Sequence, residues 1–196
     1  MNTKIILSIL ATIIGVISFF PYLRDVFKLK TKPHLYTWLI WSITQGTAVL
    51  GILYGGGGWG VLSLLAGTLL VILVLILSLK YGSKDITLSD KIILMVAIAS
   101  IIIWWKFNQP VFSIIMVSLI DFIGYIPSFR KTYKDPWSET SITWLFFSLS
   151  NILAILSIEK HSILTTCYLM VITIANLILF FISYTRRIKI KQSRVL

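Results

Sequence analysis

The sequence predicts an all-α membrane protein with seven transmembrane helices. Hydrophobic residues make up 57% of the 196 residues, and the mean hydropathy is +0.92. Charged residues make up only 13%, whereas a soluble domain carries about 25%. Apolar stretches of the length that crosses a bilayer recur along the whole chain. These observations exclude an aqueous enzyme, a disordered tail and a disulfide scaffold.

The expected spans follow one another with short connections. None alternates polar and apolar residues as barrel strands do, so each is predicted to be a helix. A span needs roughly 20 apolar residues, and the fourth and fifth stretches have only 16 each. Either their borders reach further, or they cross a locally thin region. The seven stretches are 5–23, 35–54, 59–79, 92–107, 111–126, 142–158 and 163–184.

The beginning of the chain and its cysteine content carry little further information. Lys4 is the only early charge, and no small-residue cleavage site follows the first apolar stretch. We therefore expect that stretch to remain as a permanent helix. Cys167 is the single cysteine, which excludes a disulfide or a cysteine-based metal site within one chain.

The basic residues predict the orientation in the membrane. Seven spans place Lys4, Lys106 and Lys160 on one side and the other fifteen of the eighteen Lys and Arg residues on the opposite side. Cytoplasmic loops collect such residues, so the N-terminus is expected outside and the C-terminus inside the cell (inner or plasma) membrane. The net charge of +11 is thus explained by topology, and no nucleic-acid partner is expected.

The chain contains an internal repeat. Shifting it by 106 residues aligns 21–52 with 127–158 without gaps, and ten of these 32 positions are identical. The repeat predicts two parallel three-helix bundles joined by a linker helix, a 3+1+3 plan with its binding site between the bundles near the midplane. The expected parts are a first bundle (1–81), a linker helix (82–108), a second bundle (109–185) and a basic cytoplasmic tail (186–196).

The two repeats carry a shared motif. In each, a proline closes a helix (Pro21, Pro127), a basic loop follows, and a threonine and a tryptophan open the next helix at 37–38 and 143–144. These segments resemble the PQ-loop, and the chain as a whole resembles the SWEET sugar transporters and the wider PQ-loop superfamily. It departs from that pattern where the glutamine after the proline is replaced by Tyr22 and Ser128. Trp38 and Trp41 also resemble the Trp-x-x-Trp pair of PQ-loop-like nicotinamide riboside transporters.

The resemblance implies a small-solute transporter that works by alternating access. A sugar facilitator is the leading expectation, with proton-coupled amino acid transport and nucleoside-like or nicotinamide riboside-like uptake as alternatives. A membrane receptor or assembly factor is the alternative from another class. In the family the prolines act as hinges, a role that falls here on Pro21 and Pro127, although a simple helix stop is an equal interpretation.

Asp121 is the most informative single residue, because it is the only acid inside an apolar stretch. A carboxylate at membrane depth costs at least about 2.5 kcal/mol unless it is paired, hydrated or protonated. The functional interpretation is proton coupling or substrate contact. The structural interpretation is a hydrogen bond to a neighbouring helix, through Ser118, Tyr125 or the first helix.

Further polar and aromatic residues are candidates for substrate binding. In SWEETs an asparagine at the depth of Asn176 binds the substrate, and the position equivalent to Asn176 in the first repeat is Leu70. An amide both donates and accepts hydrogen bonds; the alternative is a hydrogen bond between helices. Matching faces of the second and sixth helices add Gln45, Asn151, Trp41, Phe147, Ser42 and Ser148.

No catalytic set is visible in the sequence. His34 and His161 lie in loops on opposite sides of the membrane, and no nucleophile–base pairing or metal-ligand spacing occurs. We therefore expect no enzyme activity, no cofactor and no metal. The expected partners are a small polar solute and the lipid bilayer. The sequence does not decide whether the chain forms a homo-oligomer.

Overall fold

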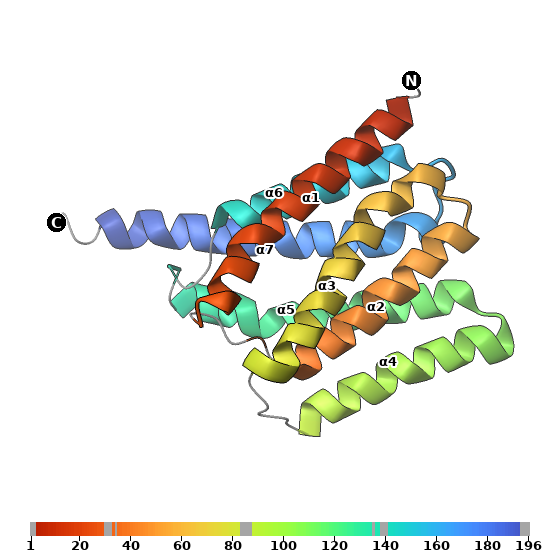
Figure 1. Cartoon of the computed structure of the whole chain (residues 1–196), viewed down its shortest axis with the longest axis horizontal. Coiled ribbons are helices and arrows are strands. Elements are labelled where there is room, and N and C mark those ends of the chain that lie inside the picture. The colour runs from red at the N-terminus through yellow and green to blue at the C-terminus, as the bar shows by residue number, and fades with distance from the viewer. Residues whose placement is uncertain are drawn as a thin grey trace.

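The computed structural model describes residues 3–29, 33, 35–82, 88–134, 136–137 and 141–192. This part of the chain is helical and contains no strand, so the all-α prediction is confirmed for it. Figure 1 shows the helices running back and forth between two ends of the molecule. They are α1 (Thr3–Phe27), α2 (Leu35–Tyr54), the 3-10 helix η1 (Gly58–Val61), α3 (Leu62–Tyr81), α4 (Leu88–Phe107), α5 (Pro110–Lys134), α6 (Ser141–Ser157) and α7 (Ile163–Gln192).

Each of the seven expected spans falls on an α-helix, the third beginning in η1 and continuing through α3. The two short ones are longer than their apolar stretches, since α4 and α5 have 20 and 25 residues. Within the described part of the chain, three helical segments are both long and apolar enough to cross a membrane: Thr3–Phe27, Gly58–Tyr81 and Ile163–Ile190. Residues 186–192 of the expected tail continue α7 as a helix. These features fit a helical membrane protein.

The two motif prolines do not end their helices. α1 continues through Pro21 to Phe27, and α5 continues through position 127 to Lys134. The helix-stop interpretation is therefore wrong. A proline inside a helix removes one backbone hydrogen bond and favours a kink, so both positions are weak points in otherwise continuous helices.

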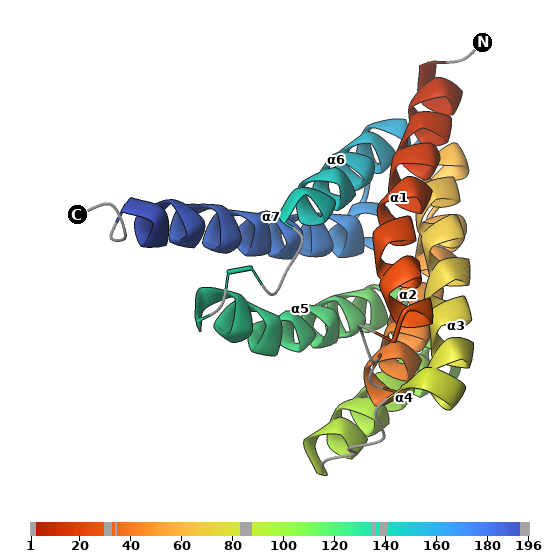
Figure 2. The ribbon, with the colours of Figure 1, turned by 60° about the vertical axis from the view of Figure 1, so that its left-hand side comes forward.

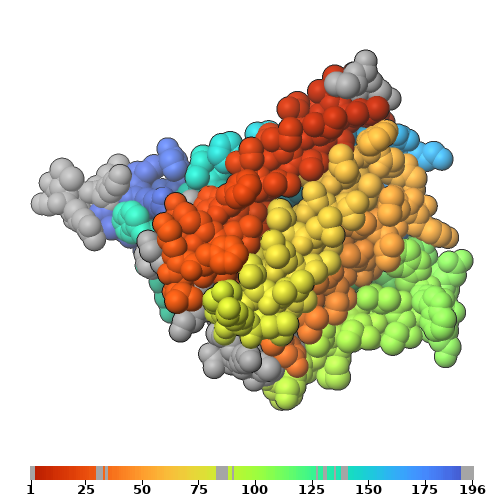
Figure 3. Space-filling view, viewed as in Figure 1, coloured from red at the N-terminus to blue at the C-terminus, as the bar shows by residue number. Residues whose placement is uncertain are grey.

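The helices form two similar sets of three. In the first set α3 packs against both α1 and α2, while the described residues of α1 and α2 meet only through side chains such as Tyr22 and Trp38. In the second set α7 packs in the same way between α5 and α6. The space-filling view shows α3 between α1 and α2 (Figure 3). Among the described residues, the sets meet mainly where α1 packs on α6 and α2 on α5, with smaller contacts of α2 with α7 and α3 with α6, and α4 packs on α2 and α5 alone.

The two ends of the molecule differ. We call the end with the start of α1 and the connections 54–58 and 157–163 the N-terminal face, and the end where α1, α3 and α5 finish and α2, α4 and α6 begin the C-terminal face. Figure 2 shows α1 and α6 side by side toward the N-terminal face, and the described residues of α1 and α5 make no close backbone contact. The largest buried hydrophobic cluster lies on the N-terminal side, with Ala11, Ile52, Ile114, Ile158 and Leu169 among its members.

Hydrogen bonds close the N-terminal face. The Lys4 ammonium donates to the Ile158 carbonyl at 2.7 Å, and the Ser8 hydroxyl donates to the Trp59 carbonyl at 2.5 Å. The Glu159 backbone N–H donates to the Gly57 carbonyl at 3.0 Å. The start of α1, the η1 segment and the connection after α6 are thereby joined, so both sets contribute to this closure.

Gly60 allows η1 to approach the end of α6. A Cβ at this position would lie 2.8 Å from Ile158 Cα and 2.9 Å from Ile158 N, where backbone must move. We expect Gly60→Ala to lower the free energy of unfolding by about 1–3 kcal/mol through overpacking, measured by thermal unfolding in detergent. Gly46→Ala is the matched control, because a Cβ there meets nothing within 4 Å. Equal stability of the two variants would contradict the expectation.

Candidate functional site

A cavity of about 530 Å³ lies between the two sets of helices. Its volume falls in the range of small-molecule sites, roughly 300–1,000 Å³. The lining residues come from α1, α2 and α3 of the first set and from α5, α6 and α7 of the second, with none from α4. The cavity therefore belongs to the interface between the sets rather than to either one.

The cavity reaches the C-terminal face and stops halfway toward the N-terminal face. At its inner end lie Gly15, Ser63 and Ser150. The hydroxyls of Ser63 and Ser150 are 3.0 Å apart, and Ser150 donates to the Ala11 carbonyl at 2.7 Å. At its other end lies Asp25, whose side chain is 30% exposed. A solute entering this cavity comes from the C-terminal face.

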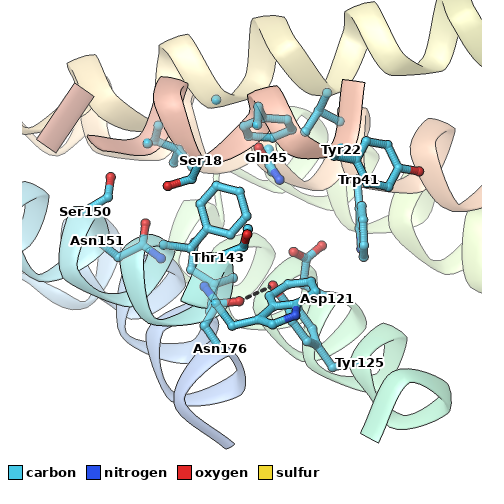
Figure 4. Close-up of a pocket in the computed structure, with 18 of the residues that line it drawn as sticks. Ser18, Tyr22, Trp41, Gln45, Asp121, Tyr125, Thr143, Ser150, Asn151 and Asn176 are labelled. Carbon is cyan, nitrogen blue, oxygen red and sulfur yellow. Dashed lines mark hydrogen bonds between the residues drawn. The ribbon is translucent and has the colours of Figure 1, made fainter. Parts of the chain in front are cut away.

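Three amide side chains line the cavity: Gln45 on α2, Asn151 on α6 and Asn176 on α7. Figure 4 shows them facing one space from different helices. The Tyr125 hydroxyl donates to Asn176 Oδ1 at 3.0 Å, so the Asn176 NH₂ group remains as a donor. The Gln45 and Asn151 amides form no hydrogen bond with any described residue. Unpaired amides in a confined space are suited to hydrogen bonding with a polar solute.

Seven aromatic side chains run around the cavity, and we call them the aromatic girdle. Neighbouring rings contact one another with centroids 5.2–6.2 Å apart. The two ends of this chain of contacts, Phe19 and Tyr22, lie one turn apart on α1. The girdle thus passes over α1, α2, α5 and α6. In order it contains Tyr22, Trp38, Trp41, Tyr125, Trp144, Phe147 and Phe19.

Asp121 lies on the cavity wall and is only 2% exposed. One carboxylate oxygen accepts a hydrogen bond from the Thr44 hydroxyl on α2 at 2.5 Å, and the other accepts one from the Tyr168 hydroxyl on α7 at 2.6 Å. The two partners belong to different sets, so Asp121 links both sets at the cavity. Neither was among the partners expected from sequence; the Ser118 hydroxyl donates instead to the Ile114 carbonyl of its own helix.

Six of the eight predicted substrate-binding residues line the cavity: Asn176, Asn151, Gln45, Asp121, Trp41 and Phe147. Ser42 and Ser148 are not in its lining. Their hydroxyls donate to the carbonyls of Trp38 and Trp144, one helical turn earlier, at 2.7 and 2.9 Å. Of the two proposed hinges, Pro21 lines the cavity, and the side chain of Pro127 lies outside the described residues.

Two features of the site were not predicted from sequence. Tyr125 was expected only as a structural partner of Asp121, although it lies four residues after Asp121, a spacing that places both on one helical face and so in one lining. The Trp144 indole N–H is buried without a hydrogen-bond partner. An unpaired buried donor is costly, so an acceptor that came within reach of this group would satisfy it. No sequence pattern shows that a buried donor lacks a hydrogen-bond partner.

The described lining contains two acids, Asp25 and Asp121, and no Lys, Arg or His. Arg24 forms an ion pair with Asp25 at 3.0 Å, so the charge of Asp25 at the cavity mouth is partly neutralised. Within the described part of the chain, no group of three His, Cys, Asp or Glu side chains is placed to hold a metal ion.

Comparison with known proteins finds no family model, no curated protein and no solved structure that matches the chain.

Proposed function

We propose that the chain is a membrane transporter that carries a small polar solute by alternating access. One observation carries this proposal: a polar and aromatic cavity lies between two similar sets of helices and reaches only one face. A site at such an interface opens to the other face when the sets tilt against each other. The closed N-terminal face holds the contacts that such a motion would break.

The packing supports a 3+1+3 architecture of the SWEET and PQ-loop type. The sets α1–α3–α2 and α5–α7–α6 have the same order of packing, and the sequence repeat relates their first two helices by 106 residues. An odd number of helices per repeat requires one more crossing for parallel repeats, and α4 supplies it. Its Trp105 is 86% exposed, in keeping with a lipid-facing linker.

The charges support the proposed orientation. Cations outside the helix core favour the cytoplasmic side, which assigns the C-terminal face to the cytoplasm of an inner or plasma membrane. The conformation described above is then the inward-facing one. Of the described cations, the C-terminal face carries Arg24, Lys28, Lys80, Lys91, Lys134, Arg186, Arg187 and Lys189, and the N-terminal face carries Lys4, Lys106 and Lys160.

The residues that line the cavity limit which classes of solute fit it. A sugar suits the three amides, which can pair with hydroxyl groups. A nucleoside-like solute is the second candidate, because the aromatic girdle can stack on a flat ring. An amino acid fits less well, since the described lining offers no basic side chain to its carboxylate.

The proposal is tested by substrate flux into liposomes that contain the purified protein. We expect saturable uptake and exchange of at least one labelled sugar or nucleoside, absent from empty liposomes. A ligand for this assay can be found by thermal shift, because a ligand that binds the folded state must stabilise it. Binding without flux would favour the alternative of a membrane receptor or assembly factor.

Asn176→Leu tests the binding role of the amide. Leucine is the residue at the equivalent position of the first repeat, so a helix in this fold accommodates it. We expect the affinity for the solute to fall by roughly 3- to 10-fold, the effect of about 1 kcal/mol from one lost hydrogen bond. The measurement is a titrated thermal shift. Thr185→Ala on the exposed end of α7 is the control, and equal affinities would contradict the prediction.

A further inference from the structure

We infer that the cavity selects small organic cations that also carry a hydrogen-bond acceptor. This inference rests on the proposed transport function and adds the charge of the solute to it. It starts from the aromatic girdle, whose seven members all line the cavity. Three of them, Trp38, Trp41 and Trp144, have the indole ring that attracts cations most strongly.

The geometry of the girdle suits a cation at its centre. Its rings come from both sets and surround one space, so a solute of this size meets several rings together. Aromatic faces carry negative charge density, and a cation within about 6 Å of a ring centroid is attracted to it. The attraction strengthens when the cation is desolvated, and the cavity wall beside the girdle includes the apolar side chains of Leu64, Val71 and Ile172.

The acidic side chain of Asp121 on the cavity wall also favours a cation. Asp121 receives hydrogen bonds on both oxygens, which is the bonding pattern of a carboxylate that acts only as an acceptor. Tyr125 of the girdle lies one turn away on the same helix. The described lining contains no basic side chain to oppose this negative charge. Coulomb attraction is strong at low dielectric, so an anionic solute is disfavoured and a cation is favoured.

Two further polar groups of the lining are hydrogen-bond donors that need an acceptor on the solute. Tyr125 occupies Asn176 Oδ1, which turns the NH₂ of that amide toward other partners. The Trp144 indole N–H is a buried donor without a partner. Both groups can only donate, so a hydroxyl or carboxamide oxygen on the cation satisfies them. The structure thus assigns a charged nitrogen to the girdle and an oxygen to the donors.

The test compares cations with neutral molecules of the same shape. The probes are choline against 3,3-dimethylbutan-1-ol, and 1-methylnicotinamide against nicotinamide, on the purified full-length chain. We expect at least one cation to bind about tenfold more tightly than its neutral counterpart, as expected for cation–π attraction in a desolvated site. The readouts are the titrated thermal shift and labelled flux in liposomes.

Matched variants assign the preference to the girdle and to Asp121. Trp41→Leu should reduce the ratio of cation to neutral affinity toward one, whereas Trp41→Phe should keep a part of it. Asp121→Asn should reduce the ratio while keeping the side-chain volume. Trp105→Leu on α4 is the control, because Trp105 is 86% exposed and outside the cavity. The ratio separates loss of selectivity from a general loss of stability, which would lower both affinities.

Equal binding of cations and neutral counterparts overturns the inference, and so does flux of sugars or neutral nucleosides that cations do not inhibit. In the second case the proposed transport function stands. Selective cation binding without any flux supports the inference about charge but contradicts the proposed transport function.

Discussion

A disulfide between Gly15→Cys and Ser150→Cys is expected to abolish transport, and its reduction to restore it. A Cβ at Gly15 would lie 3.8 Å from the Cβ of Ser150, and disulfides span about 3.5–4.5 Å between these atoms. Gly15 belongs to α1 and Ser150 to α6, so the bond joins the two sets at the inner end of the cavity. Alternating access requires these helices to separate there. The measurement is liposome flux before and after oxidation.

The design contains its own controls. Cys167→Ala removes the native thiol, so oxidation can act only on the introduced pair. Ser150→Cys alone measures the loss of the hydrogen bonds to Ser63 and Ala11 without a cross-link. Adding a reductant to the oxidised sample separates locking from damage. Undiminished flux through fully oxidised protein would show that α1 and α6 do not separate during transport.

Replacement of Asp121 is expected to have the second large effect. Asp121→Leu leaves the Tyr168 hydroxyl buried without its acceptor, at about 1–3 kcal/mol, and breaks the link to Thr44, whose hydroxyl keeps the Trp41 carbonyl at 3.3 Å. Since the partners lie in different sets, this variant should lose both stability and transport. Thermal unfolding and flux measure the two losses. Ser118→Ala on the same helix is the control, because that hydroxyl bonds only within α5.

Asp121→Asn separates a proton role from a structural one. The amide keeps the volume and one carbonyl acceptor, and a hydroxyl group can turn to suit the changed partner. We expect the folded protein to persist and any dependence of flux on pH to disappear, because no other carboxylate or histidine lines the middle of the described cavity. An unchanged pH profile in this variant would show that Asp121 does not couple protons to transport.

Much of the architecture could be predicted because a membrane restricts the choices. Apolar stretches long enough to cross a bilayer must be helical, since no water is there to pair the backbone. The repeat of 21–52 at 127–158 pointed to two similar sets of helices, and Gln45 and Asn151 could be placed at matching positions for that reason. Asp121 was evident as a candidate because a buried charge in an apolar helix is rare.

The partners of these residues could not be predicted in the same way. Thr44 and Tyr168 look like ordinary residues of apolar helices, and only the packing of α2 and α7 against α5 brings them to Asp121. Ser42 and Ser148 share a helical face with cavity residues, yet a serine in a helix can bond to its own backbone. The helix-stop interpretation of Pro21 and Pro127 failed because the turns on either side keep their own hydrogen bonds.

The sequence by itself determined the seven helices, their order along the chain and the distribution of charge, because these depend on local hydropathy and on the polarity of the connections. Only the tertiary structure decided which face is closed and which side chains meet. Contacts such as Lys4 with Ile158, or Tyr125 with Asn176, join residues 154 and 51 positions apart. Such contacts depend on how whole helices pack, and local sequence does not specify them.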